Sequence, residues 1–246
     1  LFSLLPDPAT LQEITQMLQD KNGEVQAEAI NAAGAIFKKA AIPIIRPHLE
    51  SSDPQVKRRV LECLLRYGDP DAREAASSAF LEMISHCGAE GEKSRVEAPK
   101  LAGEVYDPEF PVHLARLIRD DPSCPVVHAA MAAAGKGKYP GVLKDIISRL
   151  GDNVLKVEAR DALIEYGEIA VEDLRHALFD GDGSRNIRLN IPRTLSKIHS
   201  QAAMNALLAG LVEEDRSVRF KVILALEEMA RRFTGLRVDQ EMIESA

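Results

Sequence analysis

Residues 215–226, DRSVRFKVILAL, contain the pattern that decides the fold. An apolar anchor, Val218, is followed directly by a base, and small or apolar residues come four, seven and eight positions after the anchor. Side chains three and four residues apart share one face of an α-helix. The stretch therefore predicts an amphipathic helix, with Asp215 placed to cap its first turn.

The same pattern recurs along the whole chain. Clear copies have anchors near 187, 155 and 56, and weaker copies have anchors near 25, 94 and 126. Successive anchors are separated by 31, 38, 32, 29, 32 and 31 residues. A fixed period of this length indicates a repeat protein built from one supersecondary unit.

A second apolar helical stretch precedes each anchor. These stretches are 11–18, 42–49, 75–84, 112–118, 142–150, 171–178 and 203–211. The unit is therefore a helical hairpin, and a hairpin this short cannot bury its apolar stripe without a neighbour. We expect an all-α fold, a right-handed α-solenoid of about seven stacked hairpins that forms one domain over residues 1–246. Glycine after Tyr67 and after Tyr166 is expected to end two helices in the left-handed conformation.

The phased units resemble the HEAT repeat family. An Asp in the turn, Val-Arg three residues later, Ala at the fourth position and Ala-Leu at the seventh and eighth carry the resemblance, as do Ile-Pro pairs such as Ile42-Pro43. It covers roughly residues 11–233. It implies an armadillo-like solenoid whose second helices line a concave surface. Family members are mostly scaffolds, adaptors and regulators, although a few are enzymes.

Charge and composition narrow the possible partners. The formal net charge is −7, with 31 basic and 38 acidic side chains and no Trp. This balance disfavours generic binding to nucleic acid. No stretch is long and apolar enough to predict a transmembrane helix. The three cysteines have no metal-ligand spacing, and we expect reduced, buried thiols in a cytosolic compartment.

Charged residues recur at fixed places in the repeat. An Asp three residues before the anchor and a base directly after it are expected to form a structural ladder of caps and ion pairs between neighbouring repeats. Its members are Asp53, Lys57, Asp152, Lys156 and Asp215. In the third unit, residues 87–93 lengthen the interval, which predicts an exposed loop; whether this loop has a function stays open.

A local concentration of basic residues near the C-terminal end is the candidate partner-binding site. Its members are Arg188, Asn190, Arg193, Lys197, Arg219 and Lys221. If second helices line the inner surface, a carboxylate-rich peptide or a phosphate group could dock there. Acidic residues interleave with these bases, so a solvated, self-compensated face is the competing interpretation. Pro99 and Pro192, each five residues after an anchor, are expected to bend their helices.

No catalytic constellation is readable. The chain has neither a GxSxG motif nor a phosphate-binding loop, and none of its six histidines is followed by Glu, the pair that supplies iron ligands in HEAT-fold deoxyhypusine hydroxylases. We therefore expect no catalytic residue, no metal and no cofactor. The favoured function is a non-catalytic scaffold that binds a protein or peptide. The alternative is a lyase-type or DNA-repair enzyme that uses the inner groove.

Residues 187–226 also resemble soluble HEAT regions attached to bacterial membrane transporters. This narrower resemblance implies a bacterial, cytoplasmic chain, and a parent protein that is attached to a membrane. The Leu1 start and residues 236–246, which are expected to begin another helix, would suit a piece of a longer protein.

Overall fold

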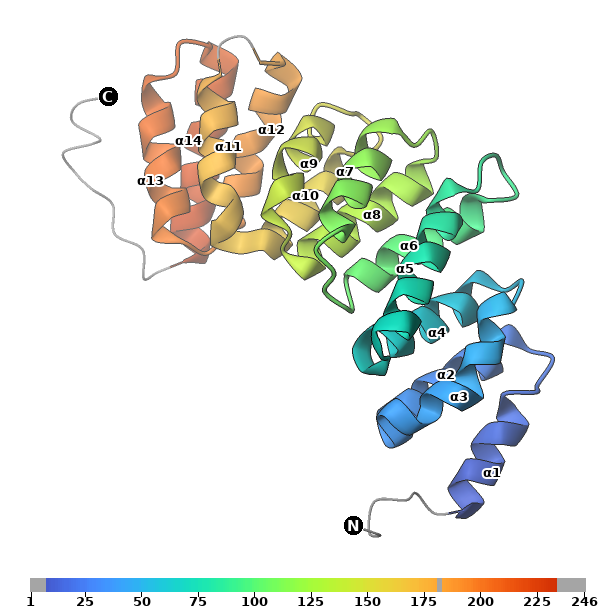
Figure 1. Ribbon diagram of the computed structural model, residues 1–246. Helices are drawn as coiled ribbons and strands as arrows, with labels where there is room; N and C mark the ends of the chain where they lie inside the picture. Colours follow the sequence, from blue (N-terminus) through green and yellow to red (C-terminus); the bar gives the residue numbers. More distant parts are fainter. Residues whose placement is uncertain (1–7, 181–182, 234–246) are drawn as a thin grey trace. The chain divides into compact units, whose positions relative to one another are not determined.

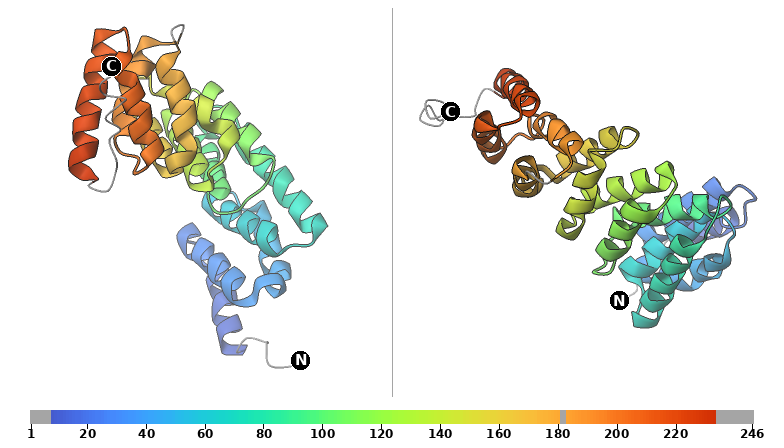
Figure 2. Two further views of the ribbon diagram at one scale, coloured as in Figure 1. Left: turned by 90° about the vertical axis from the view of Figure 1, so that its left-hand side faces the viewer. Right: turned by 90° about the horizontal axis from the view of Figure 1, so that it is seen from above.

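Helices make up the architecture throughout the part of the chain that the structure describes. The computed structural model describes residues 8–180 and 183–233, and no strand occurs among them. Figures 1 and 2 show this all-α arrangement. The chain divides into two compact units, residues 1–106 and residues 107–246. Residues 236–246, where a further helix is expected, lie outside the described residues.

Unit 1 contains three hairpins. Their second helices α2, α4 and α6 lie in chain order, because α2 packs against α4 and α4 packs against α6. The elements are α1 (Pro8–Met17), α2 (Gly23–Phe37), η1 (Lys38–Ala41), α3 (Ile42–Ile45), η2 (Arg46–Glu50), α4 (Pro54–Tyr67), α5 (Pro70–Ser85) and α6 (Glu92–Ala102).

The described residues of unit 2, 107–180 and 183–233, form four hairpins in two layers. The first helices α7, α9, α11 and α13 contact one another in order, and so do the second helices α8, α10, α12 and α14. The elements are α7 (Phe110–Asp120), α8 (Cys124–Gly137), η3 (Pro140–Val142), α9 (Leu143–Arg149), α10 (Lys156–Tyr166), η4 (Gly167–Ala170), α11 (Val171–Phe179), α12 (Arg185–Leu195), α13 (Gln201–Ala209), η5 (Gly210–Val212) and α14 (Arg216–Arg232).

The repeated apolar positions form the core. Every expected anchor lies in a second helix or at its N-cap, and every residue four positions after an anchor is buried: Ala29, Val60, Ala98, Ala130, Ala159, Ile191 and Val222. Within each unit, neighbouring hairpins bury their stripes against one another, so the core of a unit is a row of equivalent contacts. The chain is an all-α solenoid, as the period predicts. That its two units form one domain stays a prediction.

Short polar signals set the helix ends. The Asp53 side chain accepts a hydrogen bond from the Gln55 backbone N–H at 2.8 Å, and Asp215 does the same for Ser217 at 2.8 Å. Gly167 has the expected positive φ of 64°. Gly68 does not, since its φ is −70°. Glycine is needed at position 68 for space, because a Cβ there would lie 2.3 Å from the Leu64 carbonyl oxygen.

The contact between α2 and α4 depends on a second glycine. A Cβ at Gly34 would lie 2.4 Å from the Cys63 sulfur, which is buried. The two helices therefore approach as closely as they do only because position 34 carries no side chain.

We expect Gly34→Ala to lower the free energy of unfolding by about 1 to 3 kcal/mol, because it overpacks this contact. This loss outweighs the gain of about 1 kcal/mol that alanine brings to a helix interior. Urea unfolding of Gly34→Ala in the wild-type and in the Cys63→Ala background measures the effect. An equal cost in both backgrounds would show that the clash with Cys63 is not its cause.

The cysteines differ from expectation in their exposure. All three are free thiols, but only Cys63 is buried, whereas Cys87 and Cys124 are exposed. Cys87 lies in the insertion between α5 and α6, and Cys124 opens α8, so neither faces a core. Burial, helped by the charge of Glu62, raises the pKa of the Cys63 thiol to about 11.

The insertion in the third unit is exposed over Cys87–Glu90, as the sequence predicts. It is shorter than expected, because α6 already begins at Glu92. Arg95 fixes the insertion by donating to the carbonyl oxygens of His86 and, at 3.1 Å, of Gly88.

Candidate binding surface

The base that follows an anchor holds the end of the preceding helix in several repeats. Arg95 donates to the carbonyl of His86, the residue that ends α5. Arg188 Nε donates to the Leu178 carbonyl in the last turn of α11 at 3.0 Å, and Arg219 donates to the Glu213 carbonyl after η5 at 2.9 Å. The last carbonyls of a helix lack partners within it. The recurring base supplies those partners.

This role separates the six candidate partner-binding residues into two groups. Arg188 also forms an ion pair with Glu213, and the side chains of both are largely buried. The guanidinium groups of Arg188 and Arg219 therefore hold the hairpin turns, because they bind acceptors of the chain itself. The other four, Asn190, Arg193, Lys197 and Lys221, lie elsewhere on α12 and α14 and in the turn after α12.

The expected ladder is present as caps rather than as ion pairs between its own members. Lys57 reaches Glu82 at 3.9 Å, and Lys156 donates to Asn153 of its own turn at 3.3 Å. Asp152 accepts from the Val154 backbone N–H at 2.8 Å, which fits the expected cap. The Asp oxygens bind the backbone of their own helix, so the neighbouring base pairs with other groups.

Asp215 is the member of the ladder that binds a neighbouring repeat. Its carboxylate accepts from Arg185 Nε at 2.6 Å and from Arg185 Nη2 at 3.1 Å, which joins the start of α14 to the start of α12. This forked contact, together with the Ser217 backbone N–H, holds the pKa of Asp215 well below its usual range.

The outward side of the second helices in unit 2 lies opposite their buried stripe. We call it the second-helix face; its residues are Val157, Asp161, Asn190, Arg193, Lys197, Phe220, Lys221 and Leu224. Arg193 and Lys221 are exposed, and neither charged group has a partner among the described residues. Phe220, which precedes Lys221 on α14, and Leu224, three residues after Lys221, are exposed apolar side chains. The face therefore combines unpaired positive charge with apolar surface.

Arg160 on α10 is a further member of this region that the sequence analysis did not identify. It is 5% exposed, and its Nη2 donates to Asn190 Oδ1 at 3.3 Å. Its Nε has no hydrogen-bond partner. Glu158, also on α10, has a buried carboxylate oxygen that likewise has no hydrogen-bond partner. A guanidinium group stays charged in a protein, so the unsatisfied atom of Arg160 is the more costly of the two.

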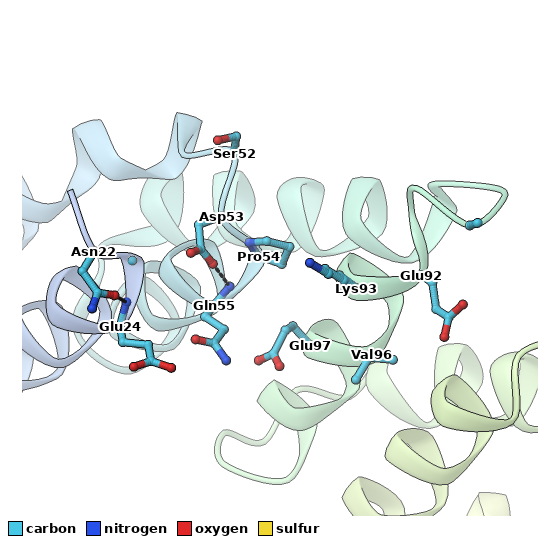
Figure 3. A pocket seen from close by; sticks show the side chains of 12 residues that line it. Asn22, Glu24, Ser52, Asp53, Pro54, Gln55, Glu92, Lys93, Val96 and Glu97 are labelled. Carbon is cyan, nitrogen blue, oxygen red and sulfur yellow. Dashed lines mark hydrogen bonds between the residues drawn. The ribbon is translucent and has the colours of Figure 1, made fainter.

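Unit 1 contains an open groove of about 1110 Å³ across the N-terminal ends of α2, α4 and α6. Figure 3 shows Glu24, Glu92 and Glu97 along it, with Lys93 between them. Glu97 is compensated from within, because it accepts from Arg58 Nε at 3.0 Å and also binds Lys100. The other carboxylates of the lining, Glu24, Asp53 and Glu92, outnumber its one base, Lys93, so the groove is acidic, and it is open rather than enclosed.

Neither a metal site nor a membrane span can be built from the part of the chain that the structure describes. Residues 8–180 and 183–233 contain no group of three or more His, Cys, Asp or Glu side chains that could hold a metal ion. No helix among these residues is long and apolar enough to cross a bilayer.

The family model for HEAT repeats matches residues 11–86, which begin inside α1 and end one residue after α5. Residues 11–86 therefore contain HEAT repeats. The described hairpins outside this range continue the same period and the same buried positions. No curated protein matches the chain.

Forty-nine solved chains are similar to this one, among them a natural enzyme, an engineered protein and a designed repeat protein. Human deoxyhypusine hydroxylase in complex with glycerol is 19% identical with a TM-score of 0.38, covering 91% of this chain and 98% of that one. An engineered protein is 19% identical with a TM-score of 0.31, covering 90% and 96%. A designed armadillo repeat protein is 17% identical with a TM-score of 0.28, covering 89% and 99%. With TM-scores this low, the likenesses carry no argument about activity.

Proposed function

We propose that this HEAT-repeat chain is a non-catalytic scaffold that binds a peptide segment of a partner protein on its second-helix face. The observation that carries the proposal is the unpaired charge of the exposed Arg193 and Lys221, together with the exposed Phe220 that precedes Lys221 on α14. Elsewhere in the same helices, Arg188 and Arg219 are used to hold turns. Positive charge left free next to apolar surface suits a peptide that carries both acidic and apolar side chains.

The groove in unit 1 gives no support to a small-molecule function. It is open, whereas small-molecule sites are usually enclosed clefts that bury most of the ligand. A lyase-type or DNA-repair enzyme remains the alternative function, but no observation on the described residues specifically favours it. The exposed free thiols of Cys87 and Cys124 suit a reducing compartment such as the cytoplasm, where we propose that the scaffold works.

Charge reversal tests the proposal. Peptides are first selected from a random displayed library for binding to the wild-type chain. Their affinities for the wild-type chain are then compared with their affinities for the double variant Arg193→Glu and Lys221→Glu. The matched control reverses two exposed bases on first helices, Arg116→Glu and Lys144→Glu, which keeps the net charge change equal.

We expect the selected peptides to bind the second-helix variant at least about tenfold more weakly, which is a loss of about 1.4 kcal/mol. Binding to the control variant should stay close to that of the wild-type chain. Peptides that bind both variants equally would refute a site on the second-helix face, as would a library that yields no binder.

A further inference from the structure

Arg160 occupies a position that is apolar in every other repeat. It stands five residues after its anchor, where the other repeats have Ile30, Leu61, Pro99, Met131, Pro192 and Ile223. Ile30, Leu61 and Met131 are fully buried there. Pro99 and Pro192 are buried as well, and only Ile223, in the last repeat that the structure describes, is exposed, at 50%. In the repeats before it, an arginine at this position places a positive charge where the fold otherwise places hydrocarbon.

The charge of Arg160 is only partly compensated. Nη2 donates to the neutral amide of Asn190, and Nε–H is buried with no acceptor. Burial and the positive charge of Arg193 lower the pKa of Arg160, and the carboxylate of Asp161 offsets them only in part. A buried cation without an anionic partner costs folding free energy, so a function that uses this charge would explain its presence.

In unit 1, a buried arginine between second helices does have an acidic partner, which Arg160 lacks. There the buried Arg58 of α4 also reaches across a seam to the next second helix, and it meets Glu97, three residues after the anchor of α6. Asn190 stands at the equivalent place, three residues after the anchor of α12. The carboxylate that completes the seam in unit 1 is therefore replaced by an uncharged amide in unit 2.

We propose that the seam between α10 and α12 is a binding site for a carboxylate, supplied by an acidic side chain of a partner peptide. The carboxylate would accept from Arg160 Nε and from Arg193, while Asn190 holds the guanidinium in place. Arg193 is exposed and lies close enough to Arg160 for its charge to lower the pKa of that group, so the two bases are neighbours at this seam. The inference rests on the proposed function and names the chemistry that the second-helix face recognises.

The first test measures the fluorescence anisotropy of a fluorescein-labelled octaglutamate peptide, titrated with the full chain at low and physiological ionic strength. Octaglutamine is the neutral probe. Because the chain is itself acidic, long-range attraction does not favour the octaglutamate probe. We expect Arg160→Met to weaken octaglutamate binding at least about tenfold, and Arg116→Gln, which removes an equal charge from α7, to leave it within about twofold.

The second test occupies the proposed site with a carboxylate of the chain itself. Asn190→Glu would place a carboxylate against Arg160 as Glu97 lies against Arg58, so it should abolish octaglutamate binding and raise the melting temperature. The matched variant Asn190→Gln keeps the amide and should keep the affinity. Unlike Arg160→Met, Asn190→Glu retains both Arg160 and Arg193. A loss of octaglutamate binding in Asn190→Glu would therefore come from occupancy of the site.

The results separate this inference from the proposed function. Binding of octaglutamate that is unchanged in Arg160→Met and in Asn190→Glu overturns the carboxylate site, as does a failure of octaglutamate to bind the wild-type chain. In either case, library peptides that still depend on Arg193 and Lys221 would leave the scaffold proposal standing. Loss of those peptides as well would remove both.

Discussion

Replacing Arg58 with Met should lower the free energy of unfolding by about 3 to 5 kcal/mol, because it breaks a buried ion pair from one side. Arg58 donates to Glu97 at 3.0 Å and to Glu104 at 2.7 Å, and its side chain is 11% exposed. Glu97 is 9% exposed as a side chain. Methionine would leave these carboxylates close together without the cation that lies between them.

Urea unfolding followed by circular dichroism measures this cost. Repeat proteins can unfold in parts, so the transition that loses the helices of unit 1 is the one to fit. Lys57→Met is the control, because its ion pair with Glu82 spans 3.9 Å and Glu82 is exposed; it should cost less than about 1 kcal/mol. If Arg58→Met changes stability as little as Lys57→Met does, the buried network is not what stabilises this seam.

The opposite result is expected for the other buried seam arginine. Arg160→Met should raise the free energy of unfolding by about 1 to 3 kcal/mol, because it removes a desolvated charge that has only an amide as its side-chain partner. The equivalent position in α8 is Met131, which is fully buried, so methionine suits this environment.

The same urea titration, fitted to the transition of unit 2, measures the gain. Met131→Arg is the matched control: it places a second unpaired cation at the equivalent position and should destabilise the chain. If Arg160→Met lowers stability instead, Arg160 stabilises the fold. The argument that Arg160 is kept for binding at a cost in stability then fails. Residues that are kept at a cost in stability are typical of functional sites.

The fold was predictable because its determinants are periodic. Each hairpin repeats the buried position four residues after the anchor, and period alone identifies such positions as one helix face. Individual helix ends were less predictable, since they depend on local packing. Gly167 has a positive φ, although its ψ of −134° lies outside the left-handed helical region, whereas Gly68 is needed because Leu64 and Ala72 leave no room for a side chain.

The binding surface was predictable only in part. The basic cluster in α12 and α14 is visible in the sequence, but which bases are free depends on contacts across the hairpin. Arg188 and Arg219 turn to carbonyls of Leu178 and Glu213, and no local pattern separates them from Arg193. A readable signal for Arg160 did exist, since it is the charged residue at a position where the other repeats are apolar.

The most direct measurement is nuclear magnetic resonance of the arginine Nε–H groups in isotope-labelled chain during titration with octaglutamate. We predict that the Arg160 Nε–H signal, assigned through its loss in Arg160→Met, shifts with the same midpoint as the anisotropy and does not shift with octaglutamine. An Arg160 signal that stays fixed while the peptide binds would contradict the account, because the carboxylate would then be held by other groups.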